Sequence, residues 1–275
     1  PILISAFYEA GLEKTYVMKT YKSKFVSENF SIAKEILVTE LAKEFDLPVP
    51  EYGVIKIDNK DLKGLYTDEE IKLLDKGHKF CTEYHEGYVI MSSLASSKFL
   101  KNFEIENLFA FDNLIMNVDR GGFRNKPNLL LKDEEMMLID HEQTFAFINS
   151  FESKDINYFN TFNNFYYQNH IFWATLKSIK NGKKEDIFVE FIEILRMLNI
   201  EKLNLIFDQL DKYDIEYGEK NIFKGKSLIN KKTSFFTDYW DVESGFVSTA
   251  EEKAIIERLG KGNEEIQNEV ENPKE

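Results

Sequence analysis

Three polar residues, Asp119, Asn128 and Asp140, lie in turns beside strongly apolar runs in the stretch "FDNLIMNVDRGGFRNKPNLLLKDEEMMLIDHEQTF". Asp119 follows a predicted helix, Asn128 stands at the start of the predicted strand "NLLL", and Asp140 directly follows the predicted strand "MMLI". Because "KDEE" joins the two strands in a hairpin, Asn128 and Asp140 are expected at the same end of it. Mg²⁺ prefers oxygen ligands and takes one or two carboxylates beside phosphate oxygens. The spacing therefore predicts a magnesium site, with Asn125 as the second candidate for its amide ligand.

A lysine and a glutamate from the N-terminal part of the chain strengthen this prediction, because each polar residue taken singly is also typical of an ordinary turn or surface position. Lys19 lies in "YVMKT", where strand alternation puts it on the same face as Val17. Glu40 falls on the apolar stripe of the helix predicted in "SENFSIAKEILVTELAKEF", together with Ile36 and Leu37. A carboxylate that faces a sheet needs a cation. We therefore expect Glu40 to pair with Lys19.

Neighbouring polar residues are expected to support this site. Asp112 sits on an apolar helical stripe and is predicted to anchor the loop of Asp119 without reacting itself. Arg120 either adds positive charge at the reaction centre or braces the same loop. His141, which directly follows Asp140, is predicted to form hydrogen bonds within its loop and not to act as a base.

The elements that must position these residues form an α+β pattern. Two β-rich runs flank Gly11, and one long helix follows, with Ser27 or Asn29 as its predicted cap. The runs "EYGVIKID" and "HKFCTEYHEGYVI" predict further strands, separated by a polar helix near Thr67–Lys76. Beyond the hairpin the chain is predicted to be mainly helical, most clearly in Phe188–Leu198 and Leu203–Leu210.

Length and composition set the remaining bounds. A chain of 275 residues exceeds a typical single domain, so we expect two lobes around one cleft. The predicted division is an N-terminal lobe over 1–90, a helical lobe over 91–248 and an acidic helix or tail over 249–275. The net charge of −13 argues against direct nucleic-acid binding. The apolar runs are too short to cross a bilayer, and the single cysteine, Cys81, fits a cytoplasmic protein.

The two motif blocks "VMKT…TELAKEFDLPVPEYGVI" and "NVDRGGFRNKPNLLL…MLIDHEQTF" resemble the HipA-like kinases, which are distant relatives of protein kinases. The resemblance spans roughly residues 1 to 150. It implies a bilobal protein-kinase-like fold, in which a small N-terminal sheet lobe with one long helix faces a larger, mainly helical lobe. It implies nucleotide binding for the first lobe and catalysis for the second. It also implies ATP and Mg²⁺ as cofactors, Lys19 on the phosphates, Asp119 as the catalytic residue, and Asn128 and Asp140 as metal ligands.

The strand order of this family places the adenine against "FCTEYHEG", with Glu83 and Tyr84 at the hinge. Three features depart from the family pattern: the turn after Asp119 is long, Glu142 stands where a glycine is expected, and the phosphate-covering turn has Gly11 as its only glycine. Ser5 is the candidate for a regulatory phosphorylation site.

The function predicted from these observations is ATP- and Mg²⁺-dependent phosphorylation of a serine or threonine in a protein. The partners implied are this protein substrate and an antitoxin or other regulatory protein, with no membrane involved. Three alternatives stay open: a kinase of lipids or small molecules, a nucleotide-binding pseudokinase that acts through protein partners, and a purely structural interaction module.

Overall fold

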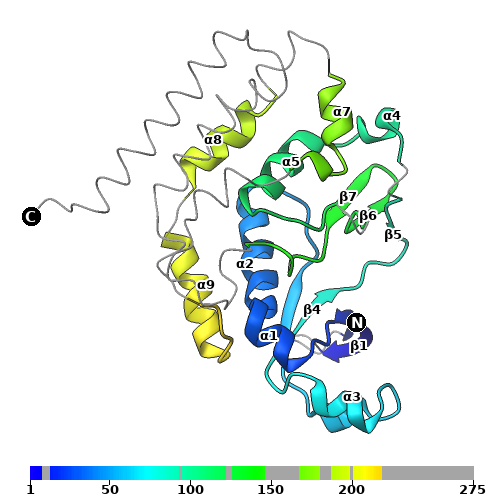
Figure 1. The fold of residues 1–275 in the computed structure, drawn as a ribbon, viewed down its shortest axis with the longest axis vertical. Coiled ribbons are helices and arrows are strands. Elements are labelled where there is room, and N and C mark those ends of the chain that lie inside the picture. The colour runs from blue at the N-terminus through cyan, green and yellow to red at the C-terminus, as the bar shows by residue number, and fades with distance from the viewer. Residues whose placement is uncertain are drawn as a thin grey trace, which may run out of the picture.

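The computed structural model describes residues 1–7, 13–92, 95–121, 126–145, 167–179, 187–198 and 201–218. Helices and strands alternate in an α+β architecture, as the sequence predicts (Figure 1). The strands are β1 Ile2–Phe7, β2 Glu13–Met18, β3 Tyr52–Ile55, β4 Lys79–Glu83, β5 Val89–Ile90, β6 Leu129–Lys132 and β7 Glu135–Leu138. The α-helices are α1 Ser23–Asn29, α2 Ser31–Glu44, α3 Asp68–Leu73, α4 Ser97–Leu100, α5 Ile105–Leu114, α7 Trp173–Lys177, α8 Val189–Met197 and α9 Glu201–Lys212. Two 3₁₀ turns, η2 Asn59–Leu62 and η4 Tyr167–Asn169, complete the described elements.

Four antiparallel strands form the first sheet in the order β1-β2-β4-β3. In β1 every second side chain is more exposed, which is the period of a strand with one covered face. The pairing of β2 with β4 continues one step beyond β2, because the backbone N–H of Lys19 donates to the carbonyl of Phe80 at 2.9 Å. This bond fixes Lys19 at the end of the sheet where the chain turns into α1.

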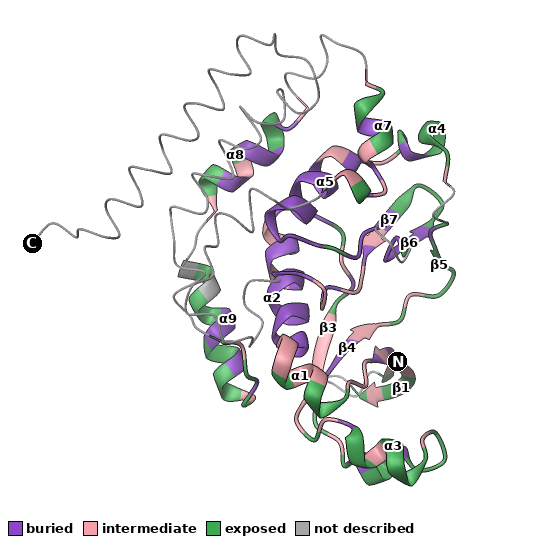
Figure 2. Cartoon of the chain, viewed as in Figure 1, coloured by how far each residue is buried: buried purple, intermediate pink, exposed green. Residues whose placement is uncertain are grey.

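The long helix predicted after β2 is two helices. Phe30 adopts a left-handed conformation (φ 50°) between α1 and α2, and it is the N-terminal cap of α2. The prediction of Ser27 or Asn29 as the side-chain cap is therefore wrong: both residues lie within α1, and no side chain caps α2. Eleven of the 14 residues of α2 are buried, so this helix runs through the interior with no solvent-facing stripe (Figure 2).

The second sheet has the order β5-β6-β7 and contains the predicted hairpin. Leu129 pairs with Leu138 at one end of the hairpin, and Lys132 pairs with Glu135 at the turn. β5 pairs with β6, so the chain has left the first sheet by residue 89. The run "HKFCTEYHEGYVI" thus supplies one strand to each sheet, and its second strand leads into the region that holds Asp119 and Asp140.

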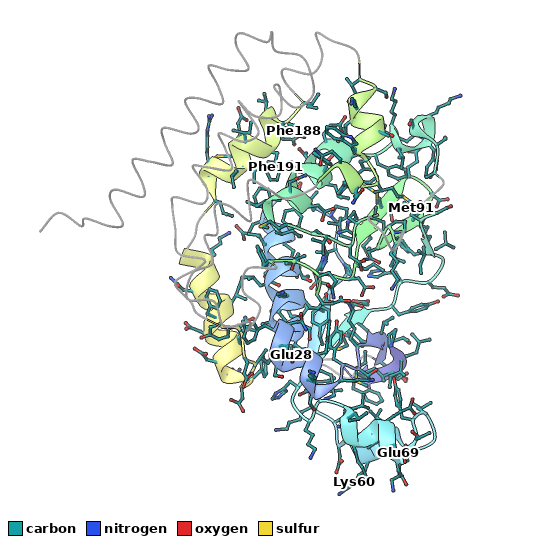
Figure 3. The ribbon with its side chains drawn as sticks, viewed as in Figure 1. Glu28, Lys60, Glu69, Met91, Phe188 and Phe191 are labelled. Atoms are coloured by element: carbon teal, nitrogen blue, oxygen red, sulfur yellow. The ribbon has the colours of Figure 1, made fainter. Side chains whose placement is uncertain are left out.

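Most buried apolar side chains form one cluster that joins α2 to α5, α8 and the hairpin. Phe191 stacks on Phe45 with ring centroids 4.8 Å apart, and Phe188 stacks on Phe109 with ring centroids 6.1 Å apart. Phe188 and Phe191 are labelled in Figure 3. A smaller cluster of Tyr16, Met18, Leu62, Leu74 and Cys81 lies against the first sheet. A small sheet beside a region dominated by helices is compatible with a kinase-like fold.

Several predictions fall on residues outside the described ranges. These are the turn around Gly11, the alternative ligand Asn125 and the acidic segment 249–275. The helices predicted near residues 67–76, 188–198 and 203–210 are confirmed as α3, α8 and α9. Within the described part of the chain, no helix is long and apolar enough to cross a membrane.

Candidate active site

Arg120 and Asp112 form a buried ion pair beneath the turn that carries Asp119. Both side chains are fully buried, and the guanidinium donates from Nε at 2.8 Å and from Nη2 at 3.2 Å to the two oxygens of Asp112. Asn117 and His170 also contact this carboxylate, at 2.8 and 2.9 Å. Burial alone would raise the pKa of Asp112, but Arg120 and His170 hold it well below its ordinary value. The structure confirms Asp112 as an anchor and assigns Arg120 to bracing.

This ion pair holds both ends of the loop between α5 and the hairpin. The Asp119 N–H donates to Asn117 Oδ1 at 3.0 Å, and Asn117 is itself bonded to Asp112. On the other side, Arg120 Nη1 donates to the carbonyl of Pro127 at 3.1 Å and to that of Asn128. The positions of Asp119 and Asn128 therefore depend on one buried guanidinium.

Asp119 and Asn128 lie side by side, as the sequence predicts. Asn128 Nδ2 donates to Asp119 Oδ2 at 3.1 Å, and both residues are buried. The amide nitrogen is occupied by this bond, so the amide oxygen of Asn128 is the atom that can ligate a metal. Asn128 has φ 50° and Asp140 has φ 63°, a left-handed conformation that Asn and Asp adopt more readily than most residues.

The register of the hairpin brings Asp140 to the same end. The N–H of Ile139 donates to the carbonyl of Asn128 at 3.1 Å, one step beyond the Leu129–Leu138 pair, and Asp140 follows directly. The Asp140 carboxylate accepts a hydrogen bond from Lys19 Nζ. A lysine from the first sheet thus meets the acidic end of the hairpin in the second sheet, which is the convergence that the sequence predicts for Lys19 and Asp140.

The helix partner of Lys19 is Glu35, and the prediction that Glu40 pairs with Lys19 is wrong. Lys19 Nζ donates to Glu35, whose side chain is only 1% exposed. Glu35 also accepts hydrogen bonds from the Tyr21 hydroxyl at 3.0 Å and from the His141 N–H at 3.1 Å. Glu40 contacts Lys43 instead, at 3.3 Å, and its side chain is 31% exposed.

The sequence argument failed at Glu40 because it assumed a helix with one apolar face. α2 is buried nearly all round, so position relative to the apolar residues does not separate Glu35 from Glu40. The spacing of Glu35 and Glu40 along α2 does separate them, because five helical residues add about 7.5 Å along the axis and about 140° around it. Lys19 is fixed where the chain enters α1, close to the N-terminal half of α2, and only Glu35 is within its reach.

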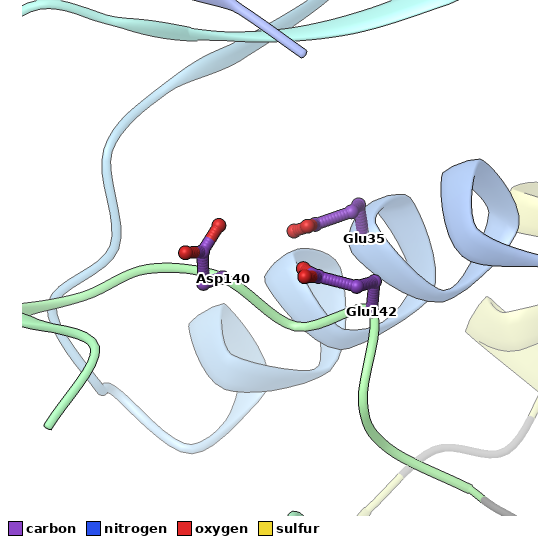
Figure 4. Close-up of side chains that lie close together, drawn as sticks. All are labelled: Glu35, Asp140 and Glu142. Atoms are coloured by element: carbon purple, nitrogen blue, oxygen red, sulfur yellow. The ribbon is translucent and has the colours of Figure 1, made fainter. Parts of the chain in front are cut away.

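Glu142 is a third carboxylate at Lys19, and no role is predicted for it from the sequence. Its Oε2 lies 3.3 Å from Lys19 Nζ. Figure 4 shows Glu35 on α2 and Asp140 and Glu142 on the segment after β7, with their carboxylates turned toward one space. One oxygen from each can be chosen so that all three lie within 4.8 Å of one another.

The charges in this cluster shift one another's protonation. Burial lowers the pKa of Lys19, but the three surrounding carboxylates outweigh burial and hold it above its ordinary value. Burial raises the pKa of Glu35 to about 8 despite Lys19, and the neighbouring Glu142 acts in the same direction. Glu142 is less enclosed, and although burial opposes its charged form, Lys19 lowers its pKa to about 2. The cluster therefore keeps Lys19 and Glu142 charged at neutral pH.

His141 is a structural residue, in agreement with the prediction. It is 2% exposed, and burial lowers the pKa of its ring to about 3, with further contributions from Arg120 and Lys19. Its backbone N–H donates to Glu35, and its carbonyl accepts from Thr144 Oγ1 at 2.8 Å. A ring that stays neutral and enclosed does not exchange protons with an outside substrate.

Glu83 and Tyr84 lie at the end of β4, where the hinge is predicted. Their N–H groups already donate to protein carbonyls, Glu83 to Glu51 at 2.7 Å and Tyr84 to Thr15 at 2.8 Å. The Glu83 carboxylate pairs with Lys14 at 2.8 Å. Backbone donors for an adenine at this edge would have to come from the residues after Tyr84, so the contacts predicted at the hinge stay a prediction.

The donor chemistry fits a hard divalent cation. An amide oxygen and a carboxylate stand at one end of the hairpin, with a second carboxylate, Glu142, two residues after Asp140. Asn128 and Asp140 would hold the metal, and it would neutralise phosphate charge there. Two hydrogen-bonded pairs, Lys19–Asp140 and Asp119–Asn128, lie at the same end of the hairpin, whereas Glu40 contacts Lys43 outside this region.

The chain was compared with curated proteins and with models of protein families. A search of curated proteins found no match to the chain. A profile of the HipA-like kinase family matches residues 9–198, which is more than half of the 275 residues and includes Lys19, Glu35, Asp119, Asn128 and Asp140. The chain therefore belongs to the family of HipA-like kinases.

Proposed function

We propose that this protein transfers the γ-phosphoryl group of ATP to a serine or threonine hydroxyl of another protein, with Mg²⁺ as the metal. The observation that carries the proposal is the contact of Lys19 with both Glu35 and Asp140. A strand lysine held by a helix glutamate, next to the acid that follows the hairpin, is the phosphate- and metal-binding arrangement of protein kinases.

Each residue has a defined task in this reaction. Asp119 orients the acceptor hydroxyl; one of its carboxylate oxygens is held by Asn128, which leaves the other to take the proton. The hydroxyl oxygen forms a bond to the γ-phosphorus as the bond to the bridging oxygen breaks, and ADP leaves. Lys19, oriented by Glu35, contacts the phosphates. Bound Mg²⁺ would neutralise charge on the triphosphate, held by Asn128 and Asp140.

The choice of a protein acceptor rests on family membership and on the charge of the chain. The net charge of −13 disfavours anionic lipids and nucleic acids as acceptors. A cytoplasmic location, and a regulatory protein or antitoxin as partner, belong to the same proposal. Phosphorylation of Ser5 in β1 would place a charged group on an exposed strand position.

The test is phosphoryl transfer from labelled ATP to a panel of proteins, lipids and small molecules, with the wild type, Asp119→Ala, Asp140→Ala and Glu40→Gln. We expect protein labelling by the wild type and Glu40→Gln, and none by the two alanine variants. If only lipids or only small molecules were labelled, the acceptor would belong to that class and not to the proteins. A wild type that binds ATP·Mg²⁺ but labels nothing would identify a pseudokinase. A wild type with no ATP binding would overturn the proposal.

A further inference from the structure

Glu142 is a charged residue of the candidate site that the proposed reaction does not use. Its carboxylate lies 3.3 Å from Lys19 Nζ, and its side chain is 18% exposed, against 1% for Glu35. Asp140 is 36% exposed. The two more accessible carboxylates on Lys19 are therefore Asp140 and Glu142, whereas Glu35 is almost fully enclosed.

The charges around Lys19 leave an excess of carboxylate. Three carboxyl groups contact one ammonium, so Lys19 alone cannot neutralise all of them. Lys34, buried on α2, is a second cation whose field acts on Glu142. Burial lowers the pKa of Lys34 to about 8, so Lys34 keeps most of its charge at neutral pH, and two cations then face three carboxyl groups.

A triphosphate that approaches Lys19 without a cation meets the charges of Asp140 and Glu142. At separations of about 5 Å such like charges repel measurably, even when solvent screens them. The same two carboxylates attract a divalent cation, which in turn attracts the phosphates. The site would thus discriminate between free nucleotide and its metal complex before any chemistry occurs.

We propose that Glu142 makes nucleotide binding at this site depend on a bound divalent cation, by repelling the metal-free triphosphate and adding to the affinity for the metal. The inference rests on the proposed function, because it assumes that the nucleotide binds at Lys19. The charge of Glu142 thus acts as a selectivity device, separate from the Asp140 ligand.

The experiment is equilibrium binding of a non-hydrolysable ATP analogue, by calorimetry, in Mg²⁺ and in EDTA. Binding of Mn²⁺ alone is measured in parallel by electron paramagnetic resonance. The variants are Glu142→Gln, which keeps the size of the side chain and removes its charge, and Glu142→Gly. Glu40→Gln is the matched control, because Glu40 contacts Lys43 and not Lys19.

For Glu142→Gln we expect about fivefold to tenfold tighter binding of the analogue in EDTA and a similar loss of affinity for Mn²⁺. Glu142→Gly should change both affinities in the same direction, and Glu40→Gln should match the wild type. Melting curves identify any variant that is not folded. If one of the two Glu142 variants is not folded, the binding data of the other test the inference.

The outcomes separate this inference from the proposed function. If the wild type binds the analogue with Mg²⁺ but the folded Glu142 variants equal it in both arms, the inference fails and the proposed function stands. If the wild type binds no analogue under either condition, both fail. If Glu40→Gln also bound the analogue more tightly in EDTA, the gain would come from the smaller net negative charge of the protein and not from the position of Glu142. That result would also overturn the role of Glu142.

Discussion

Two polar clusters lie within the same part of the molecule, and they differ in charge and in access. The Arg120–Asp112 cluster is fully buried, and Asp112 accepts hydrogen bonds from Arg120 and Asn117 and contacts His170. The Lys19 cluster is partly open, and it has more carboxylates than cations in direct contact. A buried cluster in which each charge has a partner of opposite charge is typical of a structural role. A solvent-accessible cluster with more carboxyl groups than cations is typical of a ligand-binding site.

The comparison predicts that the two clusters respond differently to substitution. Loss of a member of the Arg120–Asp112 cluster should cost folding free energy, because a buried charge is left without its partner. Loss of a member of the Lys19 cluster should cost ligand binding or turnover more than stability, because its outer carboxylates can reach water.

The largest effect is expected for Asp112→Ala. This change leaves the fully buried guanidinium of Arg120 without its carboxylate and should lower the free energy of unfolding by about 3–5 kcal/mol. Urea unfolding measures it, with Asp61→Ala, an exposed aspartate, as the control. A loss below about 1 kcal/mol, with unchanged folding cooperativity, would mean that Arg120 finds other partners and that the cluster is not the scaffold.

The next effect concerns the two glutamates of α2. Glu35→Gln should lower kcat/KM for phosphoryl transfer by about tenfold or more, because Lys19 loses the carboxyl group that holds it from α2. Glu40→Gln should leave kcat/KM unchanged, since Glu40 contacts only Lys43 among the ion pairs of the described residues. Steady-state kinetics with ATP as the varied substrate measures both. Equal losses in the two variants would contradict the assignment of Glu35.

A third effect is expected from pH. Burial depresses the pKa of His141 to about 3, below the ordinary value of 6.5, so the unfolded chain binds its proton first as pH falls. The stability contributed by neutral His141 is therefore complete above pH 6.5 and is lost between 6.5 and 3.

Between pH 7.5 and 5, protonation of the unfolded His141 should cost about 2 kcal/mol. The loss of unfolding free energy over this interval should be smaller by that amount in His141→Gln than in the wild type. The control is His78→Gln, a half-buried histidine outside both clusters. An identical pH dependence in wild type and His141→Gln would show that His141 is not held neutral by its surroundings.

Local pattern was enough to predict that the turn of Asp119 and the hairpin lie together. Asn128 and Asp140 flank two short strands joined by a tight turn, so the strand register alone brings them together. Asp119 joins them because Arg120 ties the loop to the same hairpin. In each case the positions follow from residues close in sequence.

The partners that the sequence did not predict come from elements far apart in the chain or from a helix without an exposed face. His170 reaches Asp112 from a position 58 residues away, and no periodicity indicates that contact. Glu35 was missed because α2 is buried on nearly all sides. The break at Phe30 was missed because an aromatic residue in the left-handed conformation has no distinctive sequence signal.

The most direct measurement is a crystal structure with a non-hydrolysable ATP analogue and Mg²⁺. The account predicts the metal on Asp140 and the amide oxygen of Asn128, and Lys19 on the phosphates while it keeps its contact with Glu35. The contrary result would be nucleotide bound elsewhere, for example in the cavity of about 350 Å³ between α2, β3 and α9, with Lys19 still enclosed by its three carboxylates.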